Sequence, residues 1–237
     1  GLHRCGRRPG DPATVTMAEA IGRHPWLRFS GLLSHAGHAY GAADRHAVAA
    51  IAEDERLIML AEARRLEEAG FAVPEISVGA TPTVLAASRF DGLTEIRPGN
   101  YAFMDLTPWR LGLIPRERIA LTVLTTVISR NADFLITDAG SKTFSSDTGA
   151  HGAGGEGGFG LGWPLGAFHA KGTALSLVRL SEEHGFFRRS DGDLPLGTCL
   201  RVVPNHACPV ANLARELVVL DGRDCYAWPV DARGRVR

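Results

Sequence analysis

The chain has 237 residues, of which 45% are hydrophobic and 22% are charged. That length and composition are ordinary for a soluble globular protein with one large core or two smaller ones. Basic and acidic residues balance at 26 each, so net charge favours neither nucleic acid nor an anionic membrane surface as a partner, and we expect a small molecule.

Short apolar runs alternate with helical patterns over residues 1–112, which is typical of βα units and a parallel sheet. A strand end at Gly1–Arg4 precedes a helix over about Pro12–Arg23, and Leu27–Ser34 is predicted to be a buried strand. A long helix follows over Arg45–Ala69, because apolar residues recur at helical spacing until Gly70 stops them.

Two further strands are predicted in the same region. Pro74–Val78 leads through a turn at Gly79–Thr81 into a short helix that ends at Ala87, and Leu93–Arg97 is followed by strand-breaking residues 98–100. A complete (β/α)8 barrel has eight strands in about 250 residues. These four βα units therefore predict about half of such a barrel, its C-terminal half, over residues 1–112.

From residue 113 the pattern changes to β-rich segments separated by turns. Strands are predicted over residues 118–128, 134–137, 173–178, 199–203 and 216–220. They indicate a second, mainly β domain over residues 113–237, and hence an α/β plus β protein. The glycine-rich stretch Gly149–Gly166 is predicted to be a flexible loop, with a functional lid as the alternative.

No apolar run approaches the roughly 20 residues that a membrane span needs, and residues 1–10 lack the apolar stretch of a signal peptide. The four cysteines are too few and too irregularly spaced for a disulfide scaffold or a paired CxxC zinc motif. We therefore expect no membrane partner and a cytoplasmic, reducing location.

Polar residues follow the putative strands of the first domain, where the active site of a βα barrel forms. The turns Gly79–Thr83 and Gly99–Tyr101 offer glycine-freed backbone N–H groups beside hydroxyl or amide side chains, as a bound phosphate requires. Two adjacent strands that end in this way predict one shared phosphate. Either turn alone is more often ordinary helix capping.

A different pair of donors follows the strand that ends at Val203. His206 and Cys208 are two residues apart, so in extended backbone both can point to one side and supply imidazole and thiolate to one Zn²⁺. Such a pair by itself is more often structural than ligating. Both interpretations stay open on the spacing alone.

Seven segments together resemble a known family. They are GLHRCG, SHAGHAY, SVGATPT, EIRPGNYAFMD, TDAGSKTFSSD, SEEHG and PNHACPV. In order and spacing they are similar to the D-serine dehydratase and D-threonine aldolase group of fold-type III, alanine racemase-like enzymes. These enzymes use pyridoxal phosphate and a divalent metal, and the resemblance runs through nearly the whole chain.

The resemblance assigns roles to individual residues. For the cofactor it implies that Arg4 binds the phenolic oxygen and that His35 lies against the pyridine ring. It implies that Thr81, Gly99 and Asn100 bind the phosphate. Arg97 either approaches the ring nitrogen or only braces the end of its strand. Tyr40 matches an active-site tyrosine, and His38 is a second catalytic candidate. His206 and Cys208 match the two protein ligands of the metal.

The implied activity is that of a lyase on D-configured β-hydroxy amino acids such as D-serine, D-threonine or a 3-hydroxyaspartate. Dehydration would give a keto acid and ammonia, and the alternative, aldol cleavage, would give glycine and an aldehyde. A cysteine at position 208 favours a zinc-type dehydratase, because thiolate is a soft ligand. The family resemblance also implies a homodimer.

One feature departs from the family pattern. The lysine that binds the cofactor stands on the first barrel strand in this family, upstream of the motif at Arg4. Only two lysines occur in the chain, Lys142 and Lys171, and neither follows a predicted barrel strand. We therefore expect an inactive fragment that lacks the first half-barrel, with a catalytically dead binding or regulatory remnant as the alternative.

Overall fold

The computed structural model describes residues 2–149, 158–169 and 172–235. The chain divides into two compact units. The N-terminal unit comprises residues 1–101 with 111–113, and the β-rich unit comprises residues 102–110 with 114–237. No helix among the described residues is long and apolar enough to cross a bilayer.

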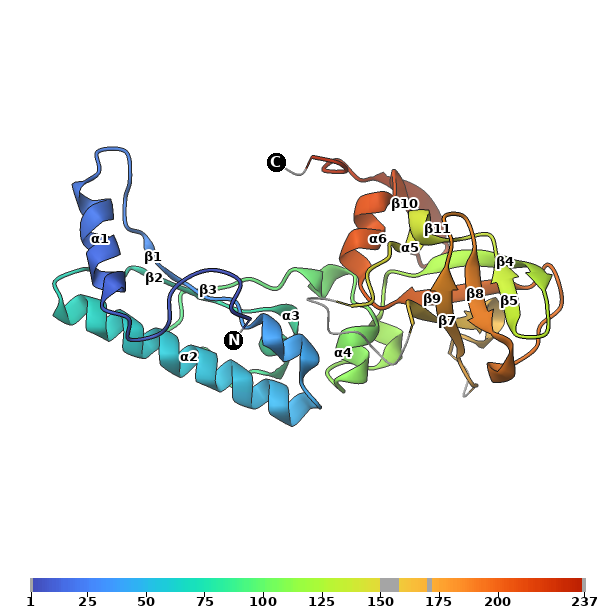
Figure 1. The fold of residues 1–237 in the computed structure, drawn as a ribbon, viewed down its shortest axis with the longest axis horizontal. Coiled ribbons are helices and arrows are strands. Elements are labelled where there is room, and N and C mark those ends of the chain that lie inside the picture. Colours follow the sequence, from blue (N-terminus) through green and yellow to red (C-terminus); the bar gives the residue numbers. More distant parts are fainter. Residues whose placement is uncertain (1, 150–157, 170–171, 236–237) are drawn as a thin grey trace. The chain divides into compact units, whose positions relative to one another are not determined.

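The N-terminal unit is built on a three-stranded parallel sheet in the order β1-β2-β3. Its strands are β1 (Gly31–Leu33), β2 (Glu75–Val78) and β3 (Glu95–Ile96), and its helices are α1 (Ala13–Arg23), α2 (Arg45–Glu68) and α3 (Thr81–Ala86). Figure 1 shows α2 running along the sheet. The predicted parallel α/β arrangement is therefore confirmed.

The long helix α2 begins and ends where the sequence predicts. The carboxylate of Asp44 accepts a hydrogen bond from Ala47 N at 2.9 Å, which caps the first turn. Gly70 follows the last turn with a φ of +89°, a conformation that glycine adopts without strain. Met59 and Leu66 lie on the face of α2 that packs against the sheet.

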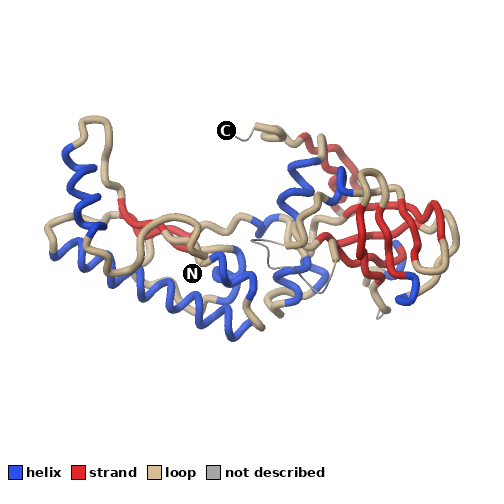
Figure 2. The backbone as a smooth tube through the Cα atoms, in the orientation of Figure 1, coloured by secondary structure: helices blue, strands red, loops and turns tan. Residues whose placement is uncertain are grey.

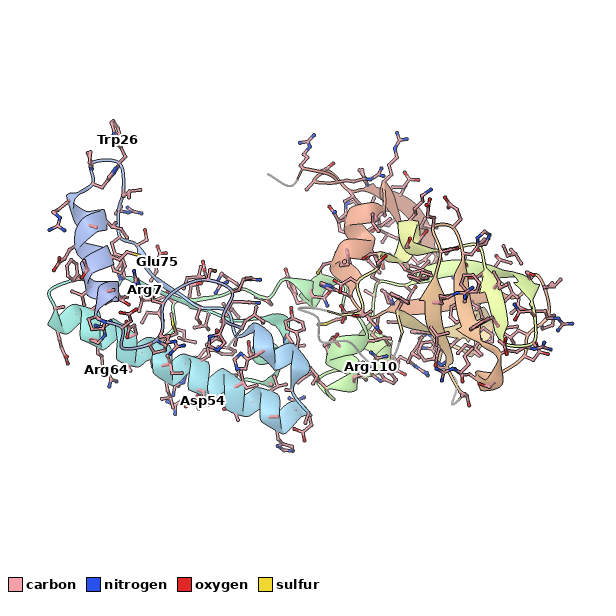
Figure 3. All side chains as sticks on the ribbon, viewed as in Figure 1. Arg7, Trp26, Asp54, Arg64, Glu75 and Arg110 are labelled. Atoms are coloured by element: carbon pink, nitrogen blue, oxygen red, sulfur yellow. The ribbon has the colours of Figure 1, made fainter. Side chains whose placement is uncertain are left out.

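Two predictions for this unit are wrong. Leu2–Arg4 form no strand, because His3 has a φ of +54°, outside the extended region. The strand predicted over Leu27–Ser34 is shorter, Gly31–Leu33, and it is not buried, since Leu33 is 68% exposed. Trp26, in the loop before β1, projects outward (Figure 3) and is 87% exposed. The sheet is open and has three strands rather than four.

The β-rich unit contains a closed barrel of antiparallel strands in the order β4-β5-β8-β7-β6-β9. Figure 2 shows these strands, in red, gathered close together. Their bounds are β4 (Val123–Arg130), β5 (Phe134–Thr137), β6 (Gly160–Pro164), β7 (Leu175–Leu180), β8 (Gly185–Arg188) and β9 (Cys199–Pro204). Leu177, Phe187 and Leu200 are among the fully buried side chains that fill it.

Shorter elements complete the two units. They are α4 (Leu106–Arg110), α5 (Ser141–Phe144), α6 (Ala207–Leu213), the hairpin of β10 (Glu216–Asp221) and β11 (Asp224–Pro229), and the 3-10 turns η1 (Gly37–Gly41), η2 (Asn100–Ala102), η3 (Arg116–Arg118), η5 (Leu165–Ala167) and η6 (Arg189–Asp191). All five β-rich segments predicted from the sequence contain a strand. Three strands, β6, β8 and β11, were not predicted.

Strand β6 corrects the interpretation of the glycine-rich stretch. Part of that stretch, residues 150–157, lies outside the described residues, as does Lys171 at positions 170–171. The described part forms a barrel strand in which glycine permits close approach. A Cβ on Gly158 would lie 2.5 Å from Leu177 O, and a Cβ on Gly160 would lie 2.6 Å from Val203 O. These glycines serve packing rather than flexibility.

Candidate functional site

The two turns predicted to share a phosphate are joined by a hydrogen bond. Thr81 begins α3 after β2, and Asn100 begins η2 after β3. Asn100 N donates to Thr81 Oγ1 at 2.9 Å, and both residues are almost fully buried. Gly99 is exposed, and no atom lies within 4 Å of the position that a Cβ would take there. A ligand can therefore approach the backbone at this turn.

Arg97 ties the ends of the three strands together. Its Nε donates to Ser77 Oγ of β2 at 2.7 Å, and its Nη2 donates to the backbone oxygen of Ser34, the residue after β1. It also pairs with Glu95 of β3 at 3.7 Å. Of the two roles that the sequence left open for Arg97, these contacts are those of a brace.

His35 lies at the same edge of the sheet. Its Nδ1 is 3.2 Å from Gly79 O, and because a carbonyl can only accept, this contact requires a proton on Nδ1. A Cβ on Gly37 would lie 3.0 Å from the His35 ring, so the glycine leaves room for it. The ring is thus held in place by the turn that follows β2.

Glu55, a buried residue of α2, is a contact of this sheet edge that no sequence motif indicates. Its Oε1 accepts a hydrogen bond from Ser34 Oγ at 2.5 Å and a longer one from Gly79 N at 3.4 Å. Partial burial lowers the pKa of His38 on η1, and the Glu55 carboxylate opposes that shift. His38 is therefore neutral near pH 7.

The remaining predicted residues of this unit are less constrained. Tyr40 is half-buried in η1, and Arg4 is exposed in the segment before α1. Thr81, Asn100, Arg97 and His35 thus gather at the carboxyl ends of β1–β3. Ligands of open α/β sheets bind at this edge.

In the β-rich unit, Asn205 organises the PNHACP motif after β9. Its Nδ2 donates to Thr148 O at 2.8 Å and to Gly158 O at 2.7 Å, and its Oδ1 accepts from Arg110 Nη1 at 3.0 Å. The backbone oxygen of Asn205 accepts from the Thr107 hydroxyl. Buried and fully hydrogen-bonded, this side chain fixes the turn that carries the next residues.

Asp105 holds the other side of the same turn. It is 1% exposed, and its two carboxylate oxygens accept from Thr107 N at 3.0 Å and from Ala207 N at 2.9 Å. Ala207 is the first residue of α6, so a carboxylate here satisfies a free N–H and suits the helix dipole. The sequence placed Asp105 in a family motif without giving it a role.

His206 and Cys208 lie close together, with a third residue beside them. The Nδ1 atom of His206 is 2.7 Å from Asp147 Oδ2. Burial alone would lower the pKa of His206, but hydrogen bonds with the Cys208 thiol and with the Asp147 carboxylate raise it to about 9. The imidazole and the thiol are thus within hydrogen-bonding reach of each other.

The donors at this position are too few for a structural zinc site, which uses four protein ligands. Within the described ranges, no group of three or more His, Cys, Asp or Glu side chains could hold a metal ion. One imidazole and one thiol fit a soft divalent metal whose other positions are open to water or substrate.

Lys142 does not have the surroundings of a catalytic lysine. It lies on α5 with its side chain 60% exposed, and it pairs with Glu183 at 2.6 Å and Glu182 at 3.0 Å. These carboxylates raise the pKa of Lys142, whereas a nucleophilic lysine needs a lowered one. The expectation that Lys142 is structural agrees with these contacts.

Two family models match the chain. Residues 120–220 match the putative serine dehydratase domain, and residues 1–107 match the alanine racemase N-terminal domain. D-threo-3-hydroxyaspartate dehydratase of Delftia sp. is 41% identical over 86% of the chain and 57% of its own length. A 3-hydroxy-D-aspartate aldolase of Paracoccus denitrificans is 32% identical over 99% of the chain and 59% of its own length.

Solved structures of related proteins superimpose on the chain. The Delftia dehydratase superimposes with a TM-score of 0.82 at 36% identity, over 96% of this chain and 62% of that one. Its solved forms include a cysteine-to-alanine mutant in the metal-free form and a mutant in which a histidine two residues earlier is alanine. An alanine racemase of Clostridium difficile, at 14% identity and a TM-score of 0.51, shares the fold alone.

The chain spans less than two thirds of the length of these relatives. The two family models together cover most of its residues, and the relatives that match it include dehydratases and aldolases. The chain belongs to the D-serine dehydratase and D-threonine aldolase family, within the alanine racemase-like fold.

Proposed function

We propose that this chain is the C-terminal part of a pyridoxal-phosphate-dependent, metal-assisted lyase for D-configured β-hydroxy amino acids. The observation that carries the proposal is the hydrogen bond between Asn100 N and Thr81 Oγ1, which joins the turns that follow two adjacent strands. In the whole protein the three-stranded sheet would belong to a (β/α)8 barrel, and the protein would be a homodimer.

The residues at the sheet edge fit the cofactor's non-covalent needs. Thr81, Gly99 and Asn100 would bind the phosphate, and His35, fixed by Gly79, would lie against the ring. Bound pyridoxal phosphate supplies an electron-accepting ring that acidifies the α-carbon of an amino acid. Neutral His38 can take up a proton on a ring nitrogen, so it suits a general base.

The pair His206 and Cys208 would hold the metal. A bound divalent cation supplies Lewis acidity toward a β-hydroxyl group. The relative whose histidine and cysteine mutants have the same two-residue spacing supports this assignment. Because imidazole and thiolate prefer zinc to harder ions, we propose Zn²⁺.

Dehydration is the reaction that the sequence supports best. The dehydratase of Delftia sp. is 41% identical to the chain, and the aldolases of Paracoccus denitrificans and Arthrobacter sp. are 31–32% identical. Aldol cleavage is the second candidate, since those aldolases align over 99% of the chain. The two reactions share one site and differ in which bond of the substrate breaks.

The test uses this chain and a longer protein that contains it, each with pyridoxal phosphate and Zn²⁺. D-threo-3-hydroxyaspartate, D-serine and D-threonine serve as substrates. The longer protein should release a keto acid and ammonia. Glycine with an aldehyde would establish the aldolase instead, and no product from any substrate would support an inactive remnant.

The chain alone should form no covalent adduct with pyridoxal phosphate. After borohydride treatment, peptide mapping should find no stoichiometric modification of Lys142, because its ammonium is held by two carboxylates. A lysine at the cofactor in the longer protein should be modified. Stoichiometric labelling of Lys142 or Lys171 would refute the assignment of the reactive lysine to a position outside this sequence.

A further inference from the structure

We infer that Asp147 is a positioning residue for the metal site: its carboxylate orients the His206 ring so that Nε2 is presented to the metal. The inference rests on the function proposed above. Asp147 Oδ2 is 2.7 Å from His206 Nδ1, and the two residues are 59 positions apart in the sequence.

Asp147 is itself held in place. Its second carboxylate oxygen, Oδ1, accepts a hydrogen bond from Gly149 N at 3.0 Å, and its backbone N–H donates to Ser145 Oγ at 3.0 Å. Both carboxylate oxygens are therefore engaged, one by its own loop and one by the imidazole. The side chain is about one third exposed, which limits its freedom without isolating it from solvent.

The loop of Asp147 is tied to the metal-site turn by a second, independent link. Asn205, the residue before His206, donates from Nδ2 to Thr148 O, the residue after Asp147. The hydrogen bond between Asn205 and Thr148 thus fixes the distance between the two segments, and the hydrogen bond between Asp147 and His206 is the second link between them. Movement of either segment would break both links together.

The chemical consequence follows from the two nitrogens of imidazole. A carboxylate can only accept a hydrogen bond, so in the neutral ring Asp147 holds the proton on Nδ1 and leaves the lone pair on Nε2. A ring with that tautomer is a ready ligand, and a carboxylate partner also raises its basicity. Cys208, two residues after His206, supplies the second donor.

The experiment measures Co²⁺ and Zn²⁺ affinity of the full chain and its variants. Asp147→Ala should weaken binding by about 10- to 100-fold, the usual effect of removing such a partner. Asp147→Asn, which keeps an acceptor oxygen without the charge, should lie between Asp147→Ala and the wild type. Asp193→Ala, an exposed aspartate of the same unit that pairs with Arg189, should leave the affinity unchanged.

A second measurement separates this inference from the metal site itself. In the metal-free chain, at a pH high enough for the His206 ring to be neutral, nitrogen NMR should find the ring proton on Nδ1 in the wild type and a mixture of tautomers in Asp147→Ala. Unchanged tautomers and unchanged affinity in that variant, with thermal unfolding as in the wild type, would overturn the role of Asp147.

The site itself is tested by Cys208→Ala and His206→Ala. If these variants bind Co²⁺ as well as the wild type does, the proposed metal site is wrong. The tautomer measurement would still decide whether Asp147 orients the ring. Loss of the thiolate-to-cobalt absorption in Cys208→Ala, together with a weaker but present band in Asp147→Ala, would support both proposals.

Discussion

The two larger sheets of this chain differ in whether their outermost strands are paired. The six barrel strands of the β-rich unit each pair with two neighbours, so their ladder closes on itself. Among the described residues of the N-terminal unit, only the central strand β2 has two partner strands, and β1 and β3 each leave one edge open. A closed sheet satisfies its backbone groups internally, whereas an open one leaves them to solvent or to another segment.

Side-chain burial follows the same division. The barrel encloses Val127, Leu135 and Phe187, all completely buried, while Leu33 at the end of β1 is more than two thirds exposed. One part of the chain thus completes its core with its own residues, and the other presents apolar surface beside an unpaired strand. The comparison indicates that the β-rich unit carries most of the stability of the isolated chain.

Hydrogen exchange should show the largest difference between the two sheets. We expect the amides of β1 and β3 to exchange about 100-fold faster, or more, than those of β5 and β9, because strands with an open edge open at low free energy. Mass spectrometry of the full chain measures this directly. Equal protection of β1 and β5 would break the comparison.

A core truncation should cost more in the barrel than in the open sheet. Phe187→Ala removes a completely buried ring and should lower the free energy of unfolding by about 3–5 kcal/mol. Leu33→Ala removes an exposed side chain and should change it by less than about 0.5 kcal/mol. Urea denaturation of both variants compares them, and similar losses would argue that β1 is covered in solution.

Replacing a barrel glycine should test whether close approach is needed. Gly160→Ala brings a methyl group to 2.6 Å from Val203 O, a backbone atom, so we expect a loss of about 1–3 kcal/mol. Gly166→Ala is the matched control, since no atom lies within 4 Å of its new methyl group. If both variants unfold at the same urea concentration, the flexible-loop interpretation regains support.

The smallest effect concerns a link within the N-terminal unit. Glu62 accepts hydrogen bonds from Arg65 and from Gly10 N, and the Arg65 guanidinium lowers the pKa of that carboxyl below its usual 4.5. The contribution of the ionised Glu62 carboxylate to the free energy of unfolding is therefore present above pH 4.5. It is lost as the pH falls through the lower pKa that Glu62 has in the folded state. Glu62→Gln should cost about 1 kcal/mol at pH 7 and little at acid pH.

Exposed Glu67 on the same helix provides the control for this measurement. Glu67→Gln should leave the unfolding midpoint unchanged at both pH values. A loss in Glu62→Gln that persists at acid pH would mean that packing, rather than charge, explains the effect.

Periodicity predicted the helices well and the strands unevenly. Helix α2 agrees with its prediction to within a residue because its cap and its glycine stop are local signals. The sequence predicts a loop at the position of β6 because glycine is permissive in any backbone. The close neighbours of Gly160 in the fold show that packing selects the glycine. The last strand, β11, is exposed along its whole length and has no apolar alternation to detect.

Some residues of the candidate site could be predicted from the sequence, and others could not. The positions of Thr81 and Asn100 follow from where two parallel strands end, so local sequence sufficed to predict that they meet. Asp147 and Glu55 could not be found by that reasoning. Barrel closure brings Asp147 to His206 from a distant segment, and Glu55 lies on a helix where its charge gives no hint of its buried partner.

Asn205 carries a consequence for the chemical ageing of the protein. Its amide nitrogen faces two carbonyl oxygens, those of Thr148 and Gly158, which both require a donor. Deamidation would replace that nitrogen with an oxygen and set three acceptors against one another in a buried place. A single hydrolytic event there would release the loop of Asp147 and the turn of His206 at once, with no change in any residue that would touch the metal.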